Sequence, residues 1–290
     1  MAGVVPDLTL SRPTVRPRRA TEEGPLIRWT LIVVAVLFFA AFLVLPLLTV
    51  FVEAFRKGTE YYFKALSDPI AWSAIKLTLL TAAIAVPLNT VFGLAAAWAI
   101  TRFSFRGRQF LSTLIDLPLW VSPVIGGLIY VLLFGTQSPI SPWLIAHHIK
   151  VVYATPGIII ATVFVTFPFV ARGLIPLMQN QGAAEEEAAL TLGARGWQVF
   201  FRVTIPKIKW GLLYSVILSN ARAMGEFGAV SVVSGHIRGL TNTIPLQIEI
   251  LYNEYSFAAA FALASLLSLL GLATLALKTY IEWRAGGRPS

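Results

Sequence analysis

Two runs of 24 consecutive uncharged residues, Trp29–Val52 and Leu77–Ile100, limit the possible folds of this chain more than any other feature. A helix needs about 20 apolar residues to cross a bilayer, whereas the apolar core of a secretion signal has only about 7–15. Charged residues make up 13% of the chain, against about 25% in soluble domains. The sequence therefore predicts an all-α polytopic membrane protein, and it excludes an ordinary soluble enzyme and a disordered chain.

Six membrane-spanning helices are the simplest interpretation of the hydropathy pattern. The four further expected spans are roughly Phe110–Phe134, Val151–Ala171, about Trp210–Ser234 and about Tyr255–Leu277. Pro118, Pro123 and Pro168 are expected to kink their helices. The expected organisation is a flexible basic tail over residues 1–28, a transmembrane domain over 29–284 with a core of about 75–279, and a C-terminal tail over 285–290.

The placement of Lys and Arg predicts the orientation of the chain. With a cytoplasmic amino terminus, 16 of these residues fall in inside segments and six in outside segments. Cytoplasmic loops carry the excess of positive charge, so both termini are expected in the cytoplasm. Retention there and contact with anionic membrane lipid account for the net charge of +9. No basic surface domain with interleaved aromatic residues is present, and nucleic-acid binding is not expected.

The sequence offers no catalytic or metal-binding chemistry. No lysine follows a glycine, so the core of the phosphate-binding loop G-x-x-x-x-G-K-[ST] is absent. There is no cysteine, and the pair His147-His148 has no third ligand near it in the sequence. We therefore expect a protein that is not an enzyme, with no catalytic residue, no metal and no bound cofactor. Any energised work requires a partner that supplies the nucleotide chemistry.

The long polar stretch over residues 172–209 predicts a short exposed helix. Ala183–Leu192 is rich in strong helix formers, and its glutamates lie in the first turn, where the helix dipole favours them. Gly193 occupies the position of a C-terminal cap glycine. The alanines leave a low apolar face, which either fits the groove of a partner or packs on the chain's own bundle.

This stretch resembles a known signature. Glu187-Ala188-Ala189, three residues, Gly193, nine residues and then Val203-x-Ile205-Pro206 is similar to the E-A-A-x3-G-x9-I-x-L-P motif of the membrane subunits of bacterial ABC importers. Val203 and Ile205 replace the Ile and Leu of the motif. The resemblance implies an ABC-importer permease fold in a bacterial cytoplasmic (inner) membrane. It implies that Glu187, Ala188, Ala189, Gly193 and Pro206 contact an ATPase subunit in the loop 182–206.

Other segments narrow the resemblance. Residues 101–109, 116–124, 220–235 and 244–249 run collinearly with the W-type permease subunits of sulfate/thiosulfate importers, and the resemblance covers about residues 30–284. It implies a heterodimer with a homologous permease subunit, two ATPase subunits that hold ATP and Mg, and an external sulfate-binding protein. Permeases of molybdate/tungstate importers share fewer segments and are the alternative. An ion-driven secondary transporter and a structural scaffold are more distant alternatives, since no paired halves are evident.

Arg222 and Glu226 are the charged residues expected near the middle of the fifth span. A charge at the bilayer centre costs at least about 2.5–3.5 kcal/mol, and the i, i+4 spacing would let the two neutralise each other on one helix face. They form either an oxyanion contact on the pathway or a structural ion pair. Gly225 and Gly228 would allow close helix packing at an interface, as would Gly126 and Gly127, while Asp116 is expected to be an interfacial or capping residue.

Overall fold

The computed structural model describes residues 25–286, and within this range every regular element is a helix. The elements are α1 (Pro25–Phe39), a π-helical turn (Ala40–Val44), α2 (Leu45–Ala54), α3 (Thr59–Leu66), α4 (Pro69–Arg102), α5 (Arg108–Trp120), α6 (Pro123–Phe134), α7 (Ser141–Ala146), α8 (Thr155–Gln181), α9 (Ala184–Thr191), α10 (Gly196–Val199), a second π-helical turn (Phe200–Thr204), α11 (Ile205–Met224), α12 (Gly228–Ser234), α13 (Ile244–Asn253) and α14 (Phe257–Gly286). The predicted all-α class is confirmed. The predicted tails over residues 1–28 and 285–290 fall mostly outside the described residues.

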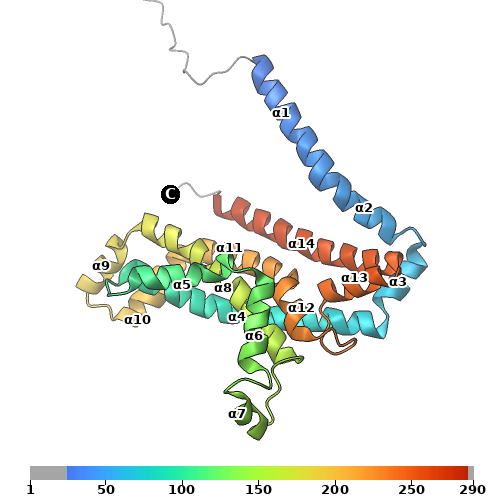
Figure 1. Ribbon diagram of the computed structural model, residues 1–290. Coiled ribbons are helices and arrows are strands. Elements are labelled where there is room, and N and C mark those ends of the chain that lie inside the picture. The colour runs from blue at the N-terminus through green and yellow to red at the C-terminus, as the bar shows by residue number, and fades with distance from the viewer. Residues whose placement is uncertain (1–24, 287–290) are drawn as a thin grey trace, which may run out of the picture. The chain divides into compact units, whose positions relative to one another are not determined.

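The chain divides into two units, residues 1–49 and residues 50–290. α1 continues through the π-helical turn into α2, which runs past the boundary between the two units, and the stretch Leu26–Ala54 is long and apolar enough to cross a membrane. The second unit holds α3 to α14, with α9 and α10 at one end and α13 at the other (Figure 1). The membrane interpretation of the first uncharged run is therefore supported by one long helix.

The described helices do not confirm the expected count of six membrane spans. Four helical stretches in the described residues are long and apolar enough, and a bent pair of helices raises this number to five. The fourth expected span, Val151–Ala171, is shifted, since α8 begins at Thr155 and continues to Gln181 through Pro168 and Pro176. The fifth expected span is missing from this set because α11 carries Lys207, Lys209 and Arg222.

The third expected span is broken rather than kinked. α5 ends at Trp120, α6 begins at Pro123, and the two helices meet at 105°. Val121 and Ser122 between them have ψ angles of 133° and 131°. A proline disfavours the helical conformation of the residue before it, so the backbone leaves the helix ahead of Pro123. The expected kink at Pro123 is therefore a complete break, and α5 and α6 match the expected span over Phe110–Phe134 only as a bent pair.

The fifth expected helix is also interrupted. α11 ends at Met224, and α12 begins at Gly228. Glu226 lies between them, outside both helices, and its Oε1 accepts a hydrogen bond of 3.0 Å from the amide of Ala229 in the first turn of α12. This side chain satisfies one of the amides that a helix start leaves unpaired. The break therefore has its own stabilising contact, and Arg222 and Glu226 do not share a helix face.

The core of the second unit lies along α4 and α8, and α8 also contacts α5, α6, α11 and α12. Gly93 of α4 allows the close approach, because a Cβ atom built there would lie 2.8 Å from the Cβ of Val170. Asn89 of α4 donates a hydrogen bond of 2.6 Å to the hydroxyl of Thr166 on α8, and both residues are buried. Hydrogen bonds between buried polar groups tie membrane helices together where no water is present. α4 and α8 thus form one tightly packed pair.

Candidate coupling site

The predicted short helix is present as α9, Ala184–Thr191, within one residue of its expected bounds at each end. Its first turn holds Glu185, Glu186 and Glu187, as the helix dipole favours. Gly193 follows the end of the helix, with a φ angle of +86° and an amide that donates to the carbonyl of Leu190 at 3.0 Å. A Cβ atom on Gly193 would meet nothing within 4 Å. The backbone conformation, and not crowding, therefore favours glycine here.

The structure brings the motif residues of α9 together on an open surface. Glu187, Ala188 and Gly193 are exposed, and Ala189 is half-buried. Pro206 is exposed in the first turn of α11. The second π-helical turn, which immediately precedes α11, contacts both α9 and α10. The two halves of the motif thus lie on neighbouring elements at one end of the second unit (Figure 1).

Large apolar side chains surround α9, and the sequence reasoning did not select them. Leu190, Leu192, Trp197 and Phe201 are 52%, 88%, 58% and 63% exposed. Aromatic residues in an otherwise polar loop were the signal that could have identified them. Their exposure on this chain favours a partner surface over packing against the chain's own bundle.

The middle glutamate of α9 faces inward, contrary to the expectation of a helix whose acidic turn is exposed. The side chain of Glu186 is only 8% exposed, and its Oε2 forms a close ion pair with Nε of Arg102. Its Oε1 accepts a hydrogen bond of 2.8 Å from the hydroxyl of Thr204. Arg102, the last residue of α4, also donates to the carbonyls of Met178 at 3.1 Å and Gly182 at 2.9 Å. These contacts hold α9 against α4, α8 and the second π-helical turn.

A second, more open set of contacts joins α9 to α11. Lys207 pairs with Glu185 at 3.1 Å and donates a hydrogen bond of 3.3 Å to the carbonyl of Gln181. The side chain of Glu185 is 64% exposed, so solvent weakens this ion pair. The buried ion pair with Arg102 therefore connects α9 to α4, and the weaker, exposed ion pair with Lys207 connects it to α11.

Arg222 and Glu226 form the ion pair that the sequence suggested, although by a different geometry. Arg222 Nη1 lies 2.6 Å from Glu226 Oε2, with side chains that are 32% and 1% exposed. Glu226 is not helical, and its other oxygen caps α12. Arg222 lies 16 residues after Pro206 on α11, which is about 24 Å along a helix. The ion pair and the α9 surface therefore lie far apart.

Two of the glycines singled out in the sequence, Gly127 and Gly228, pack closely within this chain. A Cβ atom on Gly127 would lie 2.5 Å from the carbonyl of Ala229, and one on Gly228 would lie 3.0 Å from Pro123 Cβ. These residues let α6 and α12 approach each other, whereas Gly225 is exposed. Asp116 is not a cap, since it forms a two-pronged ion pair with Arg172 of α8 at 2.7 and 3.0 Å.

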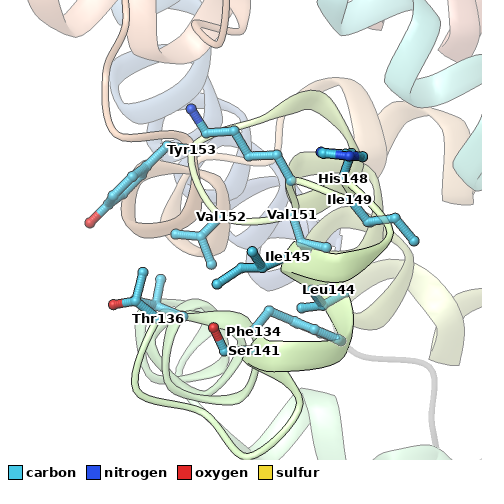
Figure 2. A pocket seen from close by; sticks show the side chains of 13 residues that line it. Phe134, Thr136, Ser141, Leu144, Ile145, His148, Ile149, Val151, Val152 and Tyr153 are labelled. Carbon is cyan, nitrogen blue, oxygen red and sulfur yellow. The ribbon is translucent and has the colours of Figure 1, made fainter.

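A cavity of about 490 Å³ lies between the end of α6, α7 and the loop that precedes α8. Its lining is mainly apolar, and Figure 2 shows Phe134, Thr136 and Ser141 on one side of it and Val152 and Tyr153 on the other. The sequence reasoning did not identify this cavity. No residue of the expected sites lines it.

Solved structures support the fold. The chain is similar to a chain in the crystal structure of a bacterial alginate ABC transporter in complex with a periplasmic protein bound to an alginate pentasaccharide, with a TM-score of 0.75 over 90% of this chain and 95% of that one. A second structure, of a bacterial ABC transporter involved in alginate import, gives a TM-score of 0.73. The sequence identities are 17% and 16%, so these likenesses concern the fold alone.

Sequence relatives are much closer. The chain is 51% identical over 257 residues to the sulfate transport system permease protein CysW of Escherichia coli, covering 89% of this chain and 88% of that protein. Identity to the CysW protein of a Synechocystis species is 50%, over 90% of this chain and 94% of that protein. The permease protein CysT of Escherichia coli is 36% identical, over 88% of this chain and 92% of that protein.

The family model described as the inner membrane component of binding-protein-dependent transport systems matches residues 89–286. The matched range includes α9, Gly193 and the whole of α11. The chain therefore belongs to the family of binding-protein-dependent transport system inner membrane components, the permease subunits of ABC importers.

Proposed function

We propose that the chain is a permease subunit of an ATP-driven importer that moves sulfate and thiosulfate into the cytoplasm. The observation that carries this proposal is the identity of about half of the aligned residues to sulfate transport permeases, over about nine tenths of both chains. Such similarity extends well beyond the coupling motif.

The α9 surface supplies the link to the energy source. Glu187 and Ala188 are open to a partner, and exposed Leu192 and Trp197 extend the same region. An ATPase subunit that packs on this surface would convert its own closure into a displacement of α9. ATP and Mg would be held by that partner, which supplies hydrolysis, while this chain contributes the moving contact.

The proposed assembly has two permease subunits, this chain and a homologue, with two ATPase subunits and an external sulfate-binding protein. It lies in the bacterial inner membrane with both termini of this chain in the cytoplasm, as the 16-to-6 distribution of Lys and Arg favours. A heterodimer is supported by the relatives, because the chain resembles both CysW and CysT of one organism. Arg222, held by buried Glu226 and one-third exposed, is the proposed oxyanion contact or interface residue of the path.

The test is ATP-dependent uptake of radiolabelled sulfate by proteoliposomes that hold the complete complex. Unlabelled thiosulfate is expected to compete, and molybdate is expected to leave uptake unchanged. Uptake blocked mainly by molybdate would assign the chain to the molybdate/tungstate importers. Sulfate uptake that continues without ATP and follows an ion gradient would favour a secondary transporter.

A further inference from the structure

We propose that Arg102 and Glu186 form a clamp that makes α9 move as one body with the C-terminal ends of α4 and α8. This inference rests on the proposed function of α9 and assigns positioning roles to two residues outside the coupling motif. The clamp would carry a displacement of α9 directly into the helices that form the core of the second unit. Without it, α9 keeps its two-residue connection to α8 and the more exposed ion pair of Glu185 with Lys207.

The covalent connection between α8 and α9 is short and turns sharply. α8 ends at Gln181, and only Gly182 and Ala183 separate it from α9. Gly182 has a φ angle of +66°, and a Cβ atom there would meet nothing within 4 Å. An open glycine turn of this kind can act as a hinge. A partner pushing on α9 would then rotate it about Gly182 unless another contact held it.

Arg102 spans this hinge. Its guanidinium donates to the carbonyl of Met178 at 3.1 Å, before the hinge, and to the carbonyl of Gly182 at 2.9 Å, within it. Met178 lies in the last turn of α8 and Gly182 is the residue that follows the helix, where helical acceptors lack partners and the dipole favours a cation. The same guanidinium pairs with Glu186, beyond the hinge. One side chain at the end of α4 thus joins both sides of the turn.

The ion pair is buried, so the two side chains resist separation. The side chains of Arg102 and Glu186 are 10% and 8% exposed, and Thr204 holds the second oxygen of Glu186. Removing one partner of a buried pair leaves an uncompensated charge, so the pair resists separation far more than an exposed one does. The neighbouring ion pair of Lys207 with Glu185 serves as the comparison for an exposed contact, because the Glu185 side chain is 64% exposed.

The clamp reaches the rest of the protein through the α4–α8 pair. Gly93 against Val170 and Asn89 against Thr166 hold these two helices together further along their length. A packed interface of this kind does not deform continuously, so a displacement at its end moves both helices together. α9, clamped to the end of this pair, therefore acts on its whole length.

The first experiment compares Arg102→Gln, Glu186→Gln and the double variant in the complete complex, with Glu185→Gln as the matched control. Sulfate transported per ATP hydrolysed is expected to fall at least about fivefold in each clamp variant, within the range of coupling between sites. The double variant is expected to lose no more than either single one, since both remove the same contact. Single losses equal to that of Glu185→Gln, or losses that multiply in the double variant, would overturn the clamp.

A second experiment leaves both clamp residues in place and does not depend on the folding of the variants. The chain has no cysteine, so Phe103→Cys and Glu185→Cys allow spin labels at the end of α4 and on α9. The clamp predicts the same distance between the labels in the nucleotide-free and the ATP-bound complex, and a changed distance would overturn it. This measurement needs no cargo. A complex without ATP-driven sulfate uptake would therefore refute the proposed function and still leave the clamp tested.

Discussion

Replacing Gly93 with alanine tests the packing of α4 on α8. The added Cβ would lie 2.8 Å from Val170 Cβ and 3.1 Å from the amide nitrogen of Ala171, whereas an ordinary contact lies at 3.4–4 Å. The helices must separate by several tenths of an ångström, or Val170 must shift within a buried cluster that includes Ala97 and Leu174. Overpacking of this kind costs about 1–3 kcal/mol.

Gly271→Ala is the control, because the same substitution there meets nothing within 4 Å in helix α14. Alanine is favoured over glycine in a helix by about 1 kcal/mol at both positions, so this gain cancels in the comparison. Gly93→Ala is expected to be less stable than Gly271→Ala by about 1–3 kcal/mol. Unfolding of the purified chain by sodium dodecyl sulfate in mixed micelles, followed by tryptophan fluorescence, measures the difference. Equal free energies of unfolding would refute the packing argument.

Three further substitutions test single contacts. Gly193→Ala is expected to cost about 1–2 kcal/mol, because alanine is strained at a φ angle of +86°. The strain should appear as faster amide hydrogen exchange in the last turn of α9, and unchanged exchange would contradict it. Glu226→Ala removes the cap of α12 and is expected to cost at least about 1 kcal/mol and to speed exchange of the Ala229 amide, so a protected amide would count against the cap. Asp116→Asn weakens an ion pair whose Arg172 side chain is 53% exposed, so it is expected to lower the free energy of unfolding by less than about 1 kcal/mol. A larger loss would contradict this estimate of the ion pair.

Helix α9 was the most predictable part of the candidate site. Alanines and glutamates favour helix, and Gly193 ends it, so local chemistry alone places α9 within one residue at each end. The long apolar runs likewise give the longest helices. These features depend on residues that are neighbours in the sequence, so they can be predicted without knowledge of the tertiary contacts.

The breaks and inward-facing residues depend on distant contacts, and sequence reasoning missed them. Pro123 indicated a kink, but the 105° bend leaves Gly127 against Ala229 of a helix about 100 residues later. Glu226 lies outside its expected helix, and its side chain accepts a hydrogen bond from the first turn of the next one. Three consecutive glutamates are equivalent by composition, and the contact with Arg102 on α4 determines that Glu186 is the one that turns inward.

The most direct test of α9 as the coupling element is the ATPase activity and sulfate uptake of a complex that carries Glu187→Arg. Glu185→Gln is the control, since it removes the neighbouring charge in the same first turn, on a residue outside the motif, without placing a cation beside Lys207. Glu187→Arg is expected to abolish uptake and the dependence of ATPase activity on the external binding protein, while Glu185→Gln retains most of both. Gly193→Asp is expected to behave like Glu187→Arg. Normal uptake and normal ATPase coupling in the Glu187→Arg complex would contradict the account.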